Sequence, residues 1–267
     1  MWPFRRRPTL KESGFFQGFT DWHSHILPGV DDGVQTLEES LRVLEEYERL
    51  GVREVWLTPH IMEDIPNTTA HLRQRFQELQ AAYLLKAPGN PAVGTHSCVS
   101  ANKTTSHSLA SSNVVETHSC VSSEETTASL KLTLHLAAEN MLDSLFEERL
   151  EHNDLLPIGP NADHLLVETS YYNPPMGMRD ILQRVQAKGY HPLLAHPERY
   201  LYMTDDAYWQ LKNMGVKFQL NQFSLYGLYG KEARKRALSL WKQGMYDYVG
   251  TDLHRLSVLR QALRWKL

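Results

Sequence analysis

The sequence predicts an α/β fold built on mostly parallel strands, in one domain spanning 1–267. Short apolar runs alternate with amphipathic helical stretches along most of the chain, and a strand followed by a helix and a further strand is the repeating unit of such folds. Hydrophobic residues make up 42% of the 267 residues and charged residues 22%. These proportions are typical of a globular enzyme.

The elements follow from local patterns, beginning with a strand near 19–23. Thr36 and Glu39 have the spacing of a capping box, and apolar residues then recur at helical intervals over 37–51. Six further strands are expected at 52–58, 132–137, 165–167, 192–195, 216–220 and 246–250, which makes seven. Helices are expected at 69–85, 178–188, 205–214, 231–243 and 255–265, with one more helical stretch after 137.

One segment, 87–129, interrupts this alternation. It is rich in Ser, Thr, Asn and Val, and the hexapeptide at 95–100 recurs unchanged at 117–122. Such a composition predicts a flexible inserted loop, because it offers too little apolar area to stabilise a packed structure. The alternative is a small zinc site, although the spacing fits no common zinc finger; its ligands would be His96, Cys98, His118 and Cys120.

Charge and hydropathy exclude several classes of protein. The net charge of -3 lacks the basic excess of nucleic-acid binders. No apolar run reaches the roughly 20 residues that span a bilayer, and Met1 to Phe4, followed by three arginines, lacks the apolar stretch of a secretory signal. We therefore expect a cytoplasmic protein without stable membrane insertion. The sequence leaves the oligomeric state open.

Metal-ligand residue types recur at or just after the predicted strand ends. Because the C-terminal ends of parallel strands in a barrel meet on one face, residues more than 200 positions apart would share one pocket there. A single histidine at a strand end is more often a packed or capped residue than a ligand, but nine such positions together favour a metal site. They are His23, His25, His60, Glu139, Glu168, His196, Asn221, Asp252 and His254.

Five segments together resemble a known family. They are DWHSHILPGVDDG at 21–33, TPH at 58–60, AEN at 138–140, AHPERY at 195–200 and GTDLH at 250–254. In this order they resemble the polymerase-and-histidinol-phosphatase (PHP) superfamily, and within it the bacterial manganese-dependent protein-tyrosine phosphatases of capsule and exopolysaccharide operons. The resemblance covers essentially the whole chain except the insert.

The resemblance implies a distorted (β/α)7 barrel of the PHP type with a centre of three divalent metal ions. Imidazole and carboxylate ligands suit manganese, iron or zinc better than calcium; the family implies manganese, and magnesium is a further candidate. The implied ligands are His23, His25, Glu139 and Asp252 for one ion, Glu139 and His196 for a second, and Asp32, His60 and His254 for the third.

The implied activity is hydrolysis of phosphotyrosine by a metal-activated water, acting on a bacterial tyrosine kinase. A cysteine-dependent route is excluded, because Cys98 and Cys120 are not followed six positions later by arginine. Two other interpretations stay open: a histidinol-phosphatase-like phosphomonoesterase of small molecules, and a catalytically silent metal-binding partner of the kinase.

We expect Arg199 to bind the substrate phosphate, since a guanidinium presents a fork of donors to two oxygens. The alternative for this residue is a surface ion pair with Glu198 or another neighbour. A second phosphate-binding arginine is unassigned, because the family's Arg-Pro-Pro stretch does not follow His254. Side chains that could stack on a phenyl ring, or equally well serve only in packing, are Met62, Tyr171, Tyr172 and Phe223.

Overall fold

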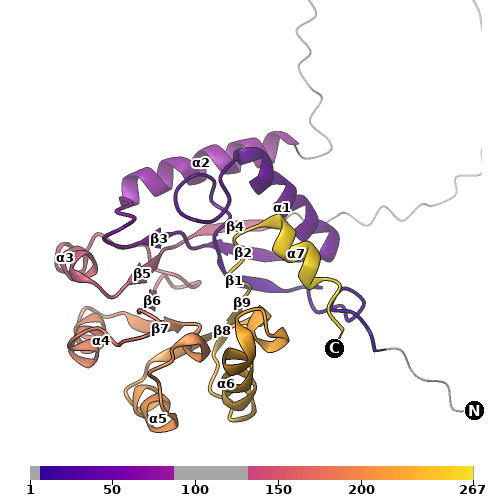
Figure 1. The fold of residues 1–267 in the computed structure, drawn as a ribbon. Helices are drawn as coiled ribbons and strands as arrows, with labels where there is room; N and C mark the ends of the chain where they lie inside the picture. Colours follow the sequence, from indigo (N-terminus) through magenta and orange to yellow (C-terminus); the bar gives the residue numbers. More distant parts are fainter. Residues whose placement is uncertain (1–6, 87–131, 267) are drawn as a thin grey trace, which may run out of the picture.

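The computed structural model describes residues 7–86 and 132–266. The predicted insert 87–129, its two cysteines and the alternative zinc site therefore lie outside the described residues. The strands gather at the centre with helices around them (Figure 1). The strands are β1 (Thr20–Ser24), β2 (Glu54–Leu57), β3 (His60–Ile61), β4 (Thr133–Leu136), β5 (Glu139–Met141), β6 (His164–Glu168), β7 (His191–Ala195), β8 (Lys217–Asn221) and β9 (Tyr248–Gly250).

The helices lie close to their predicted positions. The first, α1, begins where Thr36 accepts a hydrogen bond from the Glu39 amide and ends at Gly51, whose φ of 80° suits glycine. The last helix is shorter than the expected 255–265. The helices are α1 (Leu37–Leu50), α2 (Thr69–Lys86), α3 (Ser144–His152), α4 (Met178–Ala187), α5 (Asp205–Asn213), α6 (Gly230–Lys242) and α7 (Leu256–Ala262), with short 3-10 helices η1 (Pro197–Arg199) and η2 (Gln222–Tyr226).

Every ladder that joins two named strands within 7–86 and 132–266 is parallel, in line with the mostly parallel strands that the sequence predicts. One sheet has the order β1-β2-β4 and the other the order β3-β5-β6-β7-β8-β9. The outer strands β1 and β9 also meet, through a parallel bridge between Ser24 and Leu253. There the His25 amide donates to the Leu253 carbonyl at 2.9 Å, and the Asp252 amide donates to the His23 carbonyl at 2.7 Å. The strands thus form a strongly curled parallel arrangement.

The described residues form nine strands, two more than the seven predicted. Strand β3 continues the direction of β2 after a break at Thr58 and Pro59, and β5 continues β4 after a break at Ala137 and Ala138. Pro59 has no amide hydrogen to donate to a ladder, which accounts for the first break. Both continuations have three residues or fewer, too few to show a period in the sequence.

The core lies on both faces of the strands. On β6, Leu165 and Val167 pack against the helices α3 to α6, whereas Leu166 points the other way and packs with Trp56 and Leu193. A separate cluster joins α1, α2 and α7 to β2 and β4. None of the helices in 7–86 and 132–266 is long and apolar enough to cross a membrane.

Candidate metal centre

The predicted site residues converge at the C-terminal ends of the strands. His23 lies in β1, and His25 directly follows that strand. His60 and Glu139 begin the short strands β3 and β5. The structure groups histidines and carboxylates from these ends in three overlapping sets that could each hold a metal ion: His23, His25, Glu139 and Asp252; His25, Asp32, His60 and His254; and His60, Glu139 and Glu168.

The imidazoles of His23 and His25 form the centre of the first set. Both side chains are fully buried, and their Nε2 atoms lie 3.0 Å apart. Nε2 of His23 is 3.1 Å from Oε2 of Glu139, and Nε2 of His25 is 3.2 Å from the same oxygen. Oδ1 of Asp252 completes the set at 3.5 Å and 3.3 Å from these two nitrogens.

Hydrogen bonds on the opposite side of each ring define which nitrogen is free. Nδ1 of His23 lies 2.8 Å from Oε1 of Gln219, and the amide nitrogen of Gln219 donates to the Leu220 carbonyl. Nδ1 of His25 lies 2.8 Å from Oδ2 of Asp31, which can only accept when ionised. Each Nδ1 is therefore a donor, and each Nε2 points into the set. A ring nitrogen that faces carboxylate oxygens needs a proton or a metal ion between them, and here the Nε2 atoms of both rings can bind a metal ion.

The electrostatics of the set favour positive charge. Burial lowers the pKa of His23, but the Glu139 and Asp252 carboxylates outweigh this and raise the pKa to about 9. Burial raises the pKa of Glu139, but the neighbouring His23 and His60 hold that pKa well below its usual value. Glu139 is thus an anion buried among imidazoles, which is the environment that a divalent cation stabilises.

The second set stands nearer to solvent. Oδ1 of Asp32 lies 3.6 Å from Nε2 of His60 and 3.4 Å from Nε2 of His254. The Asp32 side chain is 65% exposed and that of His254 is 25% exposed. The predicted third metal position therefore lies at the mouth of the site, where a ligand from solution can reach it.

Glu168 belongs to the site although the predicted ligand groups omit it. Its Oε1 lies 2.9 Å from Nδ1 of His60, yet neither buried atom has a hydrogen-bond partner among the described residues. Such orphaned polar atoms fit a metal ion. In the sequence, the sign that Glu168 belongs to the site was its position at a strand end, here the end of β6.

His196 reaches the cluster through Glu139. Its Nε2 lies 3.0 Å from Oε1 of Glu139 and 3.9 Å from Oε2 of Glu168, with the imidazole almost fully buried. The backbone of His196 has a φ of 32°. A non-glycine residue in this left-handed region is strained, and such strain clusters at functional sites.

Arg199 does not pair with Glu198. Its Nη1 donates to Oδ2 of Asp252 at 2.6 Å, and its guanidinium carbon lies 4.5 Å from the ring centre of Tyr171 and 4.1 Å from that of Tyr229. Glu198 instead accepts hydrogen bonds from the Asn221 amide and the Tyr246 hydroxyl. Arg199 is thus held between two aromatic rings beside a predicted metal ligand.

A buried network behind the site fixes Asp252. The Asp21 carboxylate accepts from the Thr251 amide at 2.7 Å, the Thr251 hydroxyl at 2.6 Å and the Tyr47 hydroxyl at 2.7 Å. Asp252 itself has a φ of 52°. The network holds the neighbouring Thr251 and so helps to keep Asp252 in this strained conformation. No local pattern in the sequence indicated this role of Asp21.

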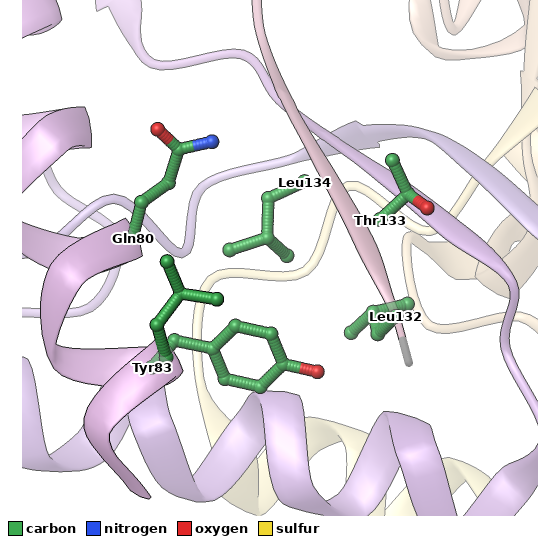
Figure 2. A pocket seen from close by; sticks show the side chains of 6 residues that line it. Gln80, Tyr83, Leu132, Thr133 and Leu134 are labelled. Atoms are coloured by element: carbon green, nitrogen blue, oxygen red, sulfur yellow. The ribbon is translucent and has the colours of Figure 1, made fainter. Parts of the chain in front are cut away.

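The four candidates for stacking on a phenyl ring separate in the structure. For Phe223 the structure favours the packing alternative, because the residue is fully buried and packs edge-on against Trp265. Tyr171 and Tyr172 both line a cavity beside Arg199. A different groove, shown in Figure 2, lies between α2 and the beginning of β4, at the opposite end of β4 from Glu139.

Residues 19–88 and 97–263 match the model of the family described as capsular polysaccharide synthesis, CpsB/CapC. The putative tyrosine-protein phosphatase CapC of Staphylococcus aureus is 22% identical over 239 residues, which are 89% of this chain and 77% of that protein. The tyrosine-protein phosphatase CpsB of Streptococcus agalactiae serotype V is 27% identical over 245 residues, 89% of this chain and 84% of that protein.

A solved structure shares the fold. It belongs to the work described as crystal structures of YwqE from Bacillus subtilis and CpsB from Streptococcus pneumoniae, unique metal-dependent tyrosine phosphatases. The TM-score is 0.67 at 22% identity, with 89% of this chain and 80% of that chain covered.

Proposed function

This chain belongs to the CpsB/CapC family of capsular polysaccharide synthesis, and on that basis we propose that it is a metal-dependent protein-tyrosine phosphatase. The relatives named tyrosine-protein phosphatases support the substrate class. The observation that carries the proposal is the pair of Nε2 atoms of His23 and His25, 3.0 Å apart and facing the carboxylates of Glu139 and Asp252. That donor arrangement fits divalent metal ions.

We propose three metal positions, with manganese as the physiological ion. The first set would use His23, His25, Glu139 and Asp252, and the second would use Asp32, His60 and His254. The third would use Glu139 and Glu168, with His196 close by. The addition of Glu168 revises the set of Glu139 and His196 that the family resemblance implies. We also infer that the curled sheet is the distorted (β/α)7 barrel of the PHP type, supported by the contact between β1 and β9.

Bound divalent ions would lower the pKa of a water molecule toward neutrality and neutralise phosphate oxygens. The protein's own residues supply orientation. Asp31 and Gln219 hold the imidazoles of His25 and His23 in fixed tautomers. Arg199 keeps guanidinium donors beyond the one given to Asp252, and these would bind oxygens of the substrate phosphate. No cysteine takes part in this scheme.

The proposed natural substrate is a phosphorylated bacterial tyrosine kinase that regulates capsule or exopolysaccharide synthesis. The family's description supports the pathway. Because protein kinases draw on cytoplasmic ATP, we expect the reaction in the cytoplasm.

Hydrolysis of a phosphotyrosyl peptide with added manganese tests the proposal. We expect turnover that a chelator abolishes and manganese restores. His196→Ala should lower turnover by about 100-fold or more, whereas His71→Ala, an exposed position on α2, should leave it unchanged. Chelator-resistant hydrolysis would contradict the proposal. Faster turnover of histidinol phosphate, assayed in parallel, would favour the small-molecule alternative, and binding of manganese without any turnover would favour the silent partner.

A further inference from the structure

A cavity of about 240 Å³ lies beside the metal-ligand cluster. Tyr171, Tyr172, Arg199, Leu201 and Tyr229 are among its lining residues. An apolar cavity of roughly 150 Å³ suffices to hold a benzene molecule. The space is therefore large enough for one aromatic ring.

The inner wall of the cavity touches the cluster itself. The Tyr229 hydroxyl donates to Oδ2 of Asp252 at 3.3 Å, the same oxygen that accepts from Arg199. The ring of Tyr171 lies 6.0 Å from the imidazole of His196, measured between ring centres. A group that enters this cavity would thus lie directly beside the proposed ligands Asp252 and His196.

The outer wall is open to solvent. The side chains of Tyr172 and Leu201 are 71% and 53% exposed. The cavity therefore connects the surface to the cluster. Apart from Arg199 and the exposed Glu232, its lining is aromatic and aliphatic, which suits a flat ring better than an alkyl alcohol or a sugar.

Tyr171 packs against the cluster around α3 to α6 and stacks on Tyr200, with ring centres 6.1 Å apart, and Tyr229 packs against the cluster of α1, α2 and α7. Their shared contact is the guanidinium of Arg199, at 4.5 Å and 4.1 Å from the two ring centres. This arrangement fixes the arginine and leaves further ring surface on the cavity wall. A phosphate bound by Arg199 would bring the ester group attached to it next to both tyrosines.

We propose that this cavity receives the aromatic ring of the substrate phosphotyrosine, and that Tyr171 and Tyr229 determine the preference for aryl over alkyl phosphate esters. The inference rests on the proposed function and adds the residues that select the substrate. Tyr171 and Tyr229 are specificity residues here, while Arg199 contacts the phosphate.

Binding of two phosphonates to the manganese-loaded protein tests this without any reaction. Phenylphosphonate and methylphosphonate differ in the ring alone, and isothermal titration gives both dissociation constants. We expect the wild type to prefer phenylphosphonate, and Tyr171→Leu or Tyr229→Leu to weaken that preference about three- to tenfold. Tyr171→Phe and Tyr229→Phe keep the ring and should keep the preference. Trp209→Leu, which removes a half-exposed aromatic residue on α5, is the matched control.

The outcomes separate the inference from the proposed function. Equal weakening of both phosphonates in the leucine variants would show that the tyrosines only position Arg199, and would overturn the inference. A wild type without preference for phenylphosphonate would also overturn it. If the leucine variants weaken the phenyl preference as expected but phosphotyrosyl peptides are not hydrolysed, the ring-binding role of the cavity is supported and the proposed phosphatase activity is contradicted. In kinetics, the same variants should raise KM for phenyl phosphate more than they lower kcat.

Discussion

Asp31 shows how a residue that lies outside the predicted ligand set can control one inside it. Its Oδ2 accepts from Nδ1 of His25 at 2.8 Å and from the His60 amide at 3.1 Å, while Oδ1 accepts from the Gly33 amide at 3.0 Å. Burial raises the pKa of Asp31, but the bond from His25 and its charge lower the pKa by more. An ionised Asp31 thus holds the imidazole that presents Nε2 to the metal set.

Asp31→Asn should weaken manganese binding by roughly 10- to 100-fold, because an amide cannot accept all three of these hydrogen bonds and carries no charge. Titration of the metal-free protein with manganese measures the change. Asp64→Asn, at an exposed position before α2, is the matched control. Unchanged manganese affinity in Asp31→Asn would show that Asp31 does not orient His25 for metal binding.

The seam between β1 and β9 is the element on which the site depends most. It joins the strand of His23 to the segment that carries Asp252 and His254. At this seam Gly250 lies so close to β1 that an added Cβ would be 2.5 Å from Cβ and 2.7 Å from the backbone nitrogen of His23. A backbone atom cannot move aside as the end of a flexible side chain can.

Gly250→Ala should therefore destabilise the protein by about 3 kcal/mol and abolish manganese binding to the first set. Urea unfolding and metal titration measure the two effects. In Gly244→Ala the added Cβ meets no atom within 4 Å, but the φ of 66° is strained for alanine. In this control variant the free energy of unfolding should fall by about 1 kcal/mol, and the manganese affinity should stay unchanged. Normal metal binding by Gly250→Ala would contradict the described seam.

A second contact between elements stabilises the fold to a degree that depends on pH. Asp247, before β9, accepts from Nζ of Lys212 in α5 at 2.6 Å and from the Phe218 amide in β8 at 2.8 Å. Burial raises the pKa of Asp247, but these hydrogen bonds and the charges of Lys212 and Lys217 lower it below 3.8. A carboxyl with a depressed folded-state pKa stabilises the fold above its unfolded pKa and loses that effect as pH falls through the folded value.

Asp247→Asn should accordingly cost about 1 kcal/mol of unfolding free energy at pH 7. The difference from the wild type should shrink as pH falls below about 4. Urea midpoints of both proteins at several pH values provide the test. A difference that is constant down to pH 3 would mean that the Asp247 charge contributes nothing.

At the scale of the whole molecule, the sequence predicted the alternation of elements well and the contacts between them poorly. The helix 69–85 and the strand 192–195 match α2 and β7 closely, because the apolar residues that mark each element lie within a few positions of one another in the sequence. The strands β3 and β5 were missed because they are short and follow breaks. The partnership of His23 with Gln219 joins residues 196 positions apart, and no local pattern records it.

The site residues also divide into those that local sequence patterns predict and those whose contacts form only in the folded chain. Strand-end positions were sufficient to predict that His25, His60 and Asp252 lie near one another, and the structure places His25 in one set with His60 and in another with Asp252. Glu168 stood at a strand end too, but its place opposite His60 depends on how β3 and β6 flank β5. The two rings beside Arg199 come from separate loops, so their pairing required the folded chain.

The predicted insert should be dispensable for activity. Lys86 ends α2 and Leu132 precedes β4, so 87–129 is connected at the end of β4 opposite to Glu139. In folds of this type, loops that lead from a helix to a strand lie away from the active site. Replacing 87–129 by a short linker should preserve metal-dependent turnover. A deletion variant that folds normally but is inactive would contradict this.

The central claim is that one cluster binds metal and that Arg199 acts on the substrate beside it. Manganese content and phosphotyrosyl-peptide turnover, measured together on the wild type, His23→Ala and Arg199→Ala, test it most directly. We predict that His23→Ala loses both manganese and turnover, because the paired Nε2 ligands are broken. Arg199→Ala should keep manganese, since Asp252 loses a competing cation, and should lose turnover. Full turnover in His23→Ala, or loss of manganese in Arg199→Ala, would contradict the account.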